Sequence, residues 1–259
     1  MKRILVAAGV ALLTLTSACG TTDATFRPAR PMDKSIEKFD LDTVDGMHDG
    51  KQQIGDGWGA TRITRGDVYF ADVDADNVED ALTSYTTNGG GSSSFTDWFV
   101  YRGGGPGKVH KVRRPVLSGF EDASYVERVR PVRGGFELHY YVWDGRDCNA
   151  CDNRVPATMT VALRDGFPVR VKPRFGAPQT CYVPMMPHTA AVHGRLTVRV
   201  APDPKAPQVT AARAYTSARF ADPTADPDLP GDIHWVLALL SGGGDPVCGW
   251  VRASDVGLS

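Results

Sequence analysis

Hydrophobic and polar positions alternate in short runs between residues 60 and 172, a pattern typical of β-strands. In GFELHYYVWD, the side chains of Phe136, Leu138, Tyr140 and Val142 fall on one face. Further runs are rich in Val, Tyr, Phe and Trp and end at Gly, Pro or Asp; they are DVYFADV, DWFVYRGG, YVERVRPV, ATMTVALRDG and PVRVKP. One short segment, SIEKFD, favours a helix. The pattern predicts a mostly β, antiparallel chain with hairpins between neighbouring strands.

Two glycine-rich segments resemble catalytic loops but do not fit them. RGGGPGKV has a glycine spacing one residue too short for a phosphate-binding loop, and Val109 stands where Ser or Thr would bind magnesium. GGGSSSF lacks the second glycine of a nucleophile elbow. The six histidines form no HExxH motif, and His139 lies inside an alternating run, which favours a structural role. The sequence therefore predicts hairpin turns here, and a protein that is not an enzyme.

Residues 1–18 have the composition of an export signal. Lys2 and Arg3 precede an apolar run from Ile4 to Leu15, and small residues follow up to Cys19. The run is shorter than the about 20 apolar residues that a membrane-spanning helix needs. The segment LTSAC resembles a bacterial lipobox, which implies cleavage before Cys19 and lipidation of its thiol. The alternative is an ordinary secretory signal that is cleaved near Ala18.

The rest of the chain divides into a tether and two predicted domains. Residues 19–35 are rich in Thr, Pro and charge, so we expect a disordered tether. A β-rich domain is predicted over 36–175 and a smaller one over 180–259. Removal of residues 1–18 deletes two basic residues and no acidic one, which moves the formal net charge from −1 to −3. This mild charge, without a basic patch, argues against nucleic acid as a partner.

Four cysteines remain after Cys19. An even number in an exported chain favours two disulfides, which three pairings allow. We expect Cys148–Cys151 and Cys181–Cys248. A redox-active CxxC pair is disfavoured because Asp147 and Asp152 flank it and would raise the thiol pKa.

The C-terminal residues resemble a bacterial SH3 (SH3b) domain. The matching positions are Val198, Arg199, Pro202 and Pro204 in the first strand and its turn, Trp235 and Val236 in a central strand, and Gly249, Trp250 and Val251 in the closing G-W-V motif. The inserted segment YTSARFADPTADPDLPGD departs from the family's pattern. The resemblance implies a small SH3-like barrel that binds peptidoglycan or its peptides. Trp250 is expected in the core, with a groove wall as the alternative, and Trp235 or Tyr215 is the candidate ligand-binding aromatic.

The segment FADVDADNVEDAL resembles the FG-GAP or VCBS type of calcium loop. Asp72, Asp74, Asp76 and Asp80 match the ligand positions, and Asn77 replaces the usual glycine, which is tolerated because asparagine adopts the left-handed conformation. Thr83 stands where an EF-hand would have its glutamate. The single copy argues against a propeller. The resemblance implies a structural Ca²⁺ site, and the alternative is a solvated acidic turn in which Asp and Asn cap their own backbone.

Together these features predict an exported bacterial lipoprotein of actinobacterial type. The expected location is the extracytoplasmic face of the cell membrane, with Cys19 as the anchor. The expected function is non-catalytic binding of cell-wall peptidoglycan or of an envelope protein. The alternative is a cell-wall enzyme or enzyme accessory, in which the SH3b-like part targets residues 36–175 to peptidoglycan.

Overall fold

The computed structural model of the chain describes residues 31–46, 62–88, 94–105, 107–120, 124–143, 154–181, 183, 186–220 and 235–258. Residues Pro31–Ser259 belong to one compact unit. Its sheets are antiparallel throughout, which confirms the prediction of a mostly β chain. The described helices are short 3-10 segments, and none is long and apolar enough to cross a membrane.

The first sheet has six strands. Its order is β1 (Arg62–Arg65), β3 (Asp80–Asn88), β4 (Ser94–Gly103) and β5 (Val109–Lys111), while β2 (Tyr69–Ala71) also pairs with β3 and β6 (Leu117–Phe120) with β4. The glycine-rich segment after Arg102 joins β4 to β5, and its turn is closed by a hydrogen bond from the Gly104 amide to the Lys108 carbonyl (2.7 Å). The predicted hairpin turn is therefore confirmed.

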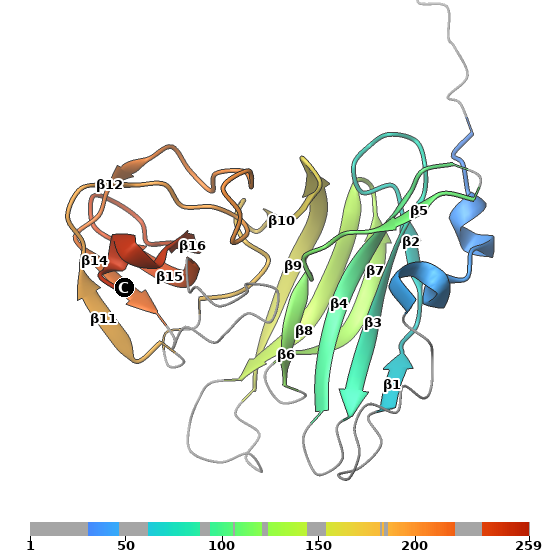
Figure 1. The fold of residues 1–259 in the computed structure, drawn as a ribbon, viewed down its shortest axis with the longest axis horizontal. Helices are drawn as coiled ribbons and strands as arrows, with labels where there is room; N and C mark the ends of the chain where they lie inside the picture. The colour runs from blue at the N-terminus through green and yellow to red at the C-terminus, as the bar shows by residue number, and fades with distance from the viewer. Residues whose placement is uncertain are drawn as a thin grey trace, which may run out of the picture. The chain divides into compact units, whose positions relative to one another are not determined.

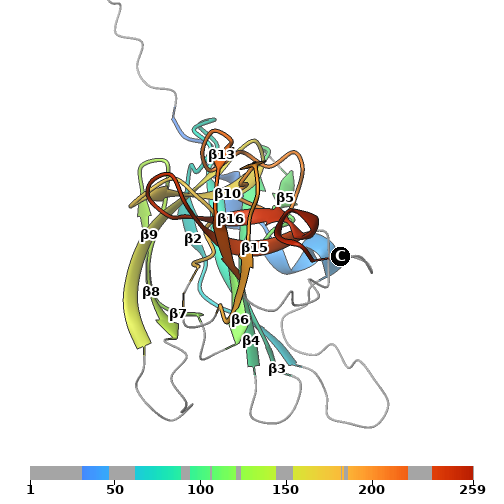
Figure 2. The ribbon, with the colours of Figure 1, turned by 90° about the vertical axis from the view of Figure 1, so that its left-hand side faces the viewer.

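The second sheet faces the first across an apolar core. Its order is β10 (Phe167–Lys172), β9 (Arg154–Arg164), β8 (Gly135–Trp143) and β7 (Ser124–Val132). Figure 2 shows β7, β8 and β9 in one layer and β3 and β4 in the other. Phe136, Leu138 and Tyr140 are buried between the layers and Val142 packs against this core, as their alternation predicts.

Two 3-10 helices, η1 (Ser35–Lys38) and η2 (Leu41–Gly46), lie beside the first sheet (Figure 1). Their buried side chains Ile36 and Leu41 form a second apolar cluster with Ala81, Tyr85, Phe99 and Tyr101 of β3 and β4. The helical pattern of SIEKFD is thus realised as η1. Residues 35–46 therefore cover part of the outer face of the first sheet.

The C-terminal residues form a smaller β structure. Its sheet has the order β11 (His188–Ala191), β14 (Ser217–Phe220), β15 (Trp235–Ser241) and β16 (Val247–Arg252), and a separate pair joins β12 (Arg195–Leu196) to β13 (Arg213–Ala214). A last 3-10 helix, η4, spans Ala253–Val256. Isolated bridges link Arg199 to Gln208 and to Trp250. These described strands surround one apolar core without closing into a barrel.

An apolar cluster connects the two β structures. Ala162 and Val169 of β9 and β10 pack with Val200, Ala201 and Ala206. The connecting segment adds polar contacts to the larger β structure: the Gln179 amide donates to the Pro115 carbonyl (3.3 Å), and the hydroxyls of Tyr140 and Thr180 are 3.0 Å apart. The segment between β10 and β11 is therefore bound to the larger β structure through Gln179 and Thr180.

Candidate cation site and binding surface

The acidic loop connects β2 to β3 at one end of the two facing sheets. Val73 anchors it: this side chain is 1% exposed, and its carbonyl accepts a hydrogen bond from the Leu163 amide of β9 in the second sheet (3.1 Å). Ala75 and Asn77 adopt left-handed backbone conformations, with φ of 64° and 66°. The left-handed Asn77 agrees with its replacement of glycine in the calcium-loop pattern.

The loop brings three of the four predicted ligands together. Carboxylate oxygens of Asp72, Asp74 and Asp80 lie within 4.8 Å of one another. Asp76 is turned to other partners, since its Oδ1 accepts a hydrogen bond from the Val78 amide (2.8 Å). The Asp72 carboxylate also accepts from the amides of Asp76 and Asn77, at 3.2 and 3.0 Å. Backbone donors thus fix two of the carboxylates at the loop's own turn.

Asp80 is the most deeply buried of the three carboxylates in the site. Its side chain is 0% exposed, and its two oxygens accept hydrogen bonds from the amides of Val73 (2.9 Å) and Gly103 (3.0 Å). Gly103 is required here, because a Cβ at this position would lie 2.4 Å from the Glu79 carbonyl oxygen. Burial raises the pKa of Asp80 to about 7, and the charges of Asp74 and Asp76 add to that shift, although the two amide donors oppose it.

A cation already contacts the loop from β4. The Arg102 guanidinium donates to Oδ2 of Asp74, and the same nitrogen is 3.7 Å from Oδ2 of Asp76. The sequence pattern did not identify this residue, because Arg102 is 28 positions away from Asp74. The antiparallel register of β3 and β4, in which Ala81 faces Tyr101, places it beside the loop.

The second carboxylate oxygen of Asp74, Oδ1, bears on whether the three aspartates can bind a metal ion. Oδ1 of Asp74 is buried and has no hydrogen-bond partner among the described residues. A buried carboxylate oxygen without a donor is costly, and a hard cation such as Ca²⁺ is a suitable partner for it. The donor set of Asp72, Asp74 and Asp80 therefore fits a divalent cation.

The same loop holds the start of the described chain. The Asp33 amide donates to the Asn77 carbonyl (3.1 Å), the Glu79 amide donates to the Asp33 carbonyl (2.8 Å), and the Asn77 side chain donates to the Pro31 carbonyl (3.2 Å). The conformation of the acidic loop thus controls where residues 31–33, which belong to the predicted tether, are held.

A second candidate site, made of aromatic and charged side chains, lies on the outer face of the second sheet. Tyr125 of β7 faces Tyr141 of β8, and Arg128 and Arg130 face His139 and Glu137. The Tyr125 side chain is 50% exposed. The Arg130 guanidinium is 3.0 Å from Glu137, and Nε2 of His139 is 3.1 Å from both Arg128 and Glu137. The hydrogen bond from His139, with the charge of Arg130, lowers the pKa of Glu137.

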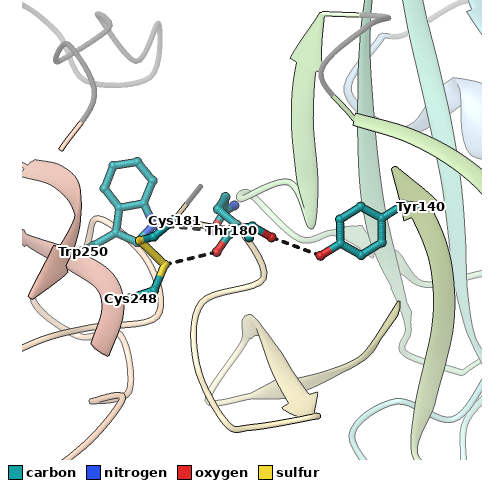
Figure 3. Close-up of a disulfide and its surroundings, with 6 residues drawn as sticks. Tyr140, Thr180, Cys181, Cys248 and Trp250 are labelled. Carbon is teal, nitrogen blue, oxygen red and sulfur yellow. Dashed lines mark hydrogen bonds between the residues drawn. A yellow bond between two sulfur atoms is a disulfide. The ribbon is translucent and has the colours of Figure 1, made fainter. Parts of the chain in front are cut away.

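The predicted cysteine pairing is confirmed where the structure describes it. Cys181 and Cys248 form a disulfide with a Cα–Cα distance of 5.5 Å. The pair Cys148–Cys151 and the lipidation residue Cys19 lie outside the described residues. Figure 3 shows the disulfide between β16 and the connecting segment, with Thr180 pointing to Tyr140. The disulfide thereby fixes the segment that contacts the larger β structure.

Two predictions for C-terminal aromatic residues are corrected. Tyr215 is 2% exposed and belongs to the C-terminal core, so its ring cannot form a ligand-binding wall. Trp250, expected in that core, is only half-buried; its indole lies beside the disulfide and its Nε1 donates to Gln179 (3.5 Å) (Figure 3). Gly249 and Val251 are buried on the other face of β16, and strand alternation directs Trp250 away from them. Trp235 is half-buried at the start of β15.

The resemblances to a lipobox, to FG-GAP loops and to SH3b domains remain predictions. Each rests on the residues quoted for it, and the described geometry bears only on the acidic loop and on the C-terminal aromatics. Comparison of the chain with protein-family models, with curated proteins and with solved structures finds no match.

Proposed function

We propose that the chain is a lipid-anchored protein of the extracytoplasmic face of the membrane, which binds cell-wall peptidoglycan or a wall-associated envelope protein without catalysis. The lipobox-like segment before Cys19 supports the anchor. The Cys181–Cys248 disulfide supports export, because disulfides persist in oxidising compartments outside the cytoplasm.

The observation that carries the binding proposal is the outer face of the second sheet. Tyrosine and arginine are the residue types that contribute most to recognition surfaces, and this face presents both in adjacent cross-strand rows. The exposed ring of Tyr125 offers an apolar surface to a sugar ring or a peptide side chain. Arg128 and Arg130 offer guanidinium donors to carboxylates, which peptidoglycan peptides carry.

The C-terminal part contributes a second contact in this proposal. Trp235 is half-buried and remains the candidate aromatic residue there, while Tyr215 is excluded by its burial. Leu237 and Leu239 are half-buried on the same face of β15 as Trp235. A ligand that contacts Trp235 would therefore meet an apolar strip as well as an indole ring.

We also propose that the acidic loop holds Ca²⁺ through Asp72, Asp74 and Asp80, with Asp76 beside them. The ion would have a structural role, because it would neutralise carboxylates at the connection between β2 and β3 and fix the loop that holds residues 31–33. Its affinity should be in the weak range of extracellular modules, roughly 0.1–1 mM.

Replacement of Cys19 by alanine tests the anchor. The substituted protein should move from the membrane fraction into the medium, because the diacylglycerol and any further acyl chain are then absent. Quantitative immunoblotting of both fractions measures the distribution. A substituted protein that stays in the membrane fraction to the same degree would overturn the lipoprotein proposal.

Co-sedimentation of the purified mature protein with isolated peptidoglycan tests the binding proposal. The mature protein should appear in the pellet, and a protein that stays in the supernatant at every peptidoglycan concentration would reject wall binding.

A further inference from the structure

We infer that Arg102 is the resident counter-ion of the acidic loop, and that a divalent cation binds only by displacing its guanidinium. The inference rests on the proposed Ca²⁺ site, and it assigns the residue that sets the affinity of that site.

Asp80 and Arg102 are held in different ways. Asp80 is fully buried and bonded to two backbone amides, and Gly103 cannot be replaced by a larger residue without contact with the Glu79 carbonyl. The Arg102 side chain is 41% exposed, and carboxylates bind its guanidinium. The guanidinium can therefore leave towards solvent while the frame around Asp80 stays in place.

Arg102 and an incoming cation compete for the same carboxylate. The guanidinium binds Oδ2 of Asp74, while Oδ1 of Asp74 is buried and has no hydrogen-bond partner among the described residues. A divalent ion between Asp72, Asp74 and Asp80 would lie within a few ångströms of a positive charge that Asp74 and Asp76 now hold. Like charges at that distance repel strongly in a partly buried site. Binding of the ion therefore requires the Arg102 contact to break.

Arg102 affects both stability and affinity. In the metal-free protein, the positive charge of Arg102 offsets the repulsion between the carboxylates of Asp74 and Asp76. Loss of Arg102 should therefore lower the melting temperature. With a metal ion, loss of Arg102 removes a competitor. A half-exposed pair contributes up to about 1 kcal/mol, so the apparent Kd for Ca²⁺ should fall by up to about fivefold on removal of the arginine.

The experiment compares Arg102→Met with the wild type and with the control Arg65→Met. Arg65 also lies in the first sheet and pairs with a carboxylate, Asp42 (2.8 Å), and its register partner on β3 is Tyr85, five positions beyond Asp80. Thermal melts in chelator and in increasing Ca²⁺, together with calorimetric titration, give the melting temperature and the Kd of each protein. Arg102→Lys is the second variant, and its retained charge should give a Kd between the other two.

The expected result is a lower melting temperature of Arg102→Met in chelator, with tighter Ca²⁺ binding that restores the melting temperature to at least the wild-type value. Arg65→Met should bind Ca²⁺ like the wild type. A wild type and an Arg102→Met variant with the same Kd would overturn the role of Arg102 and leave the Ca²⁺ site standing. If neither responds to Ca²⁺, both proposals fail. If only Arg102→Met responds, the guanidinium occupies the site and Ca²⁺ is not a ligand of the native protein.

Discussion

Replacement of Cys248 by serine is expected to lower the free energy of unfolding by about 4 kcal/mol. The disulfide with Cys181 spans a sequence separation of 67 residues, so it removes much conformational entropy from the unfolded chain. It also fixes Gln179 and Thr180, which contact Pro115 and Tyr140 of the larger β structure. Loss of the disulfide should therefore weaken the contact between the two β structures as well as the C-terminal core.

Urea unfolding of the oxidised proteins measures this loss. The control is Cys151→Ser, because a disulfide with Cys148 would close a very short loop and contribute little by the same entropy argument. Wild-type protein treated with reductant should resemble Cys248→Ser. Equal unfolding midpoints of Cys248→Ser and Cys151→Ser would contradict the role assigned to the longer disulfide.

Replacement of Asp80 by alanine is expected to destabilise the protein by about 2–5 kcal/mol, with or without Ca²⁺, because two buried amides lose their acceptor. Those amides belong to Val73 in the acidic loop and to Gly103 at the end of β4. Asp76→Ala is the matched control. The Val78 amide that it leaves without an acceptor is in an exposed hydrogen bond, and water replaces the carboxylate there. Chemical unfolding that shows equal losses for the two variants would contradict the buried role of Asp80.

The stability of the Ca²⁺-free protein should also depend on Asp80 through pH. The pKa of Asp80 is about 7 in the folded protein against an ordinary value of 3.8, so the folded state holds an extra proton between these values. The contribution of this protonation to the free energy of unfolding is fully present below about pH 4. It is lost as the pH rises to about 7, and the loss is at most about 4 kcal/mol. Asp80→Ala should flatten this slope. A wild-type profile without any decline between about pH 5 and about pH 7 would show that the buried carboxyl is ionised throughout.

Local patterns predicted the elements of the fold better than the contacts between them. The alternation around Phe136 and Leu138 identified the core face of β8, because strand periodicity depends only on neighbouring residues. Asn77 marked a left-handed position for the same local reason. Arg102 was missed because only the register of β3 and β4 brings it to Asp74. The sequence carries no local signal for that register.

The C-terminal errors have a related cause. The G-W-V motif indicated a strand correctly but not which face of it is buried. Gly249 and Val251 take the core positions, so Trp250 lies on the other face beside the disulfide. Tyr215 was a candidate ligand-binding aromatic, whereas it fills the C-terminal core. The outer-face row of Tyr125 and Tyr141 was likewise hidden, since cross-strand neighbours depend on the hairpin register.

Peptidoglycan binding by Tyr125→Ala and by Phe95→Ala tests the central proposal most directly. Both residues are exposed aromatics, 50% and 44% exposed, but Tyr125 lies on the second sheet and Phe95 on β4 of the first. A tyrosine at the centre of a binding surface contributes more than about 1 kcal/mol, so Tyr125→Ala should bind about tenfold more weakly in co-sedimentation, while Phe95→Ala should bind like the wild type. Equal binding by all three proteins would contradict the assignment of this sheet face as the binding surface.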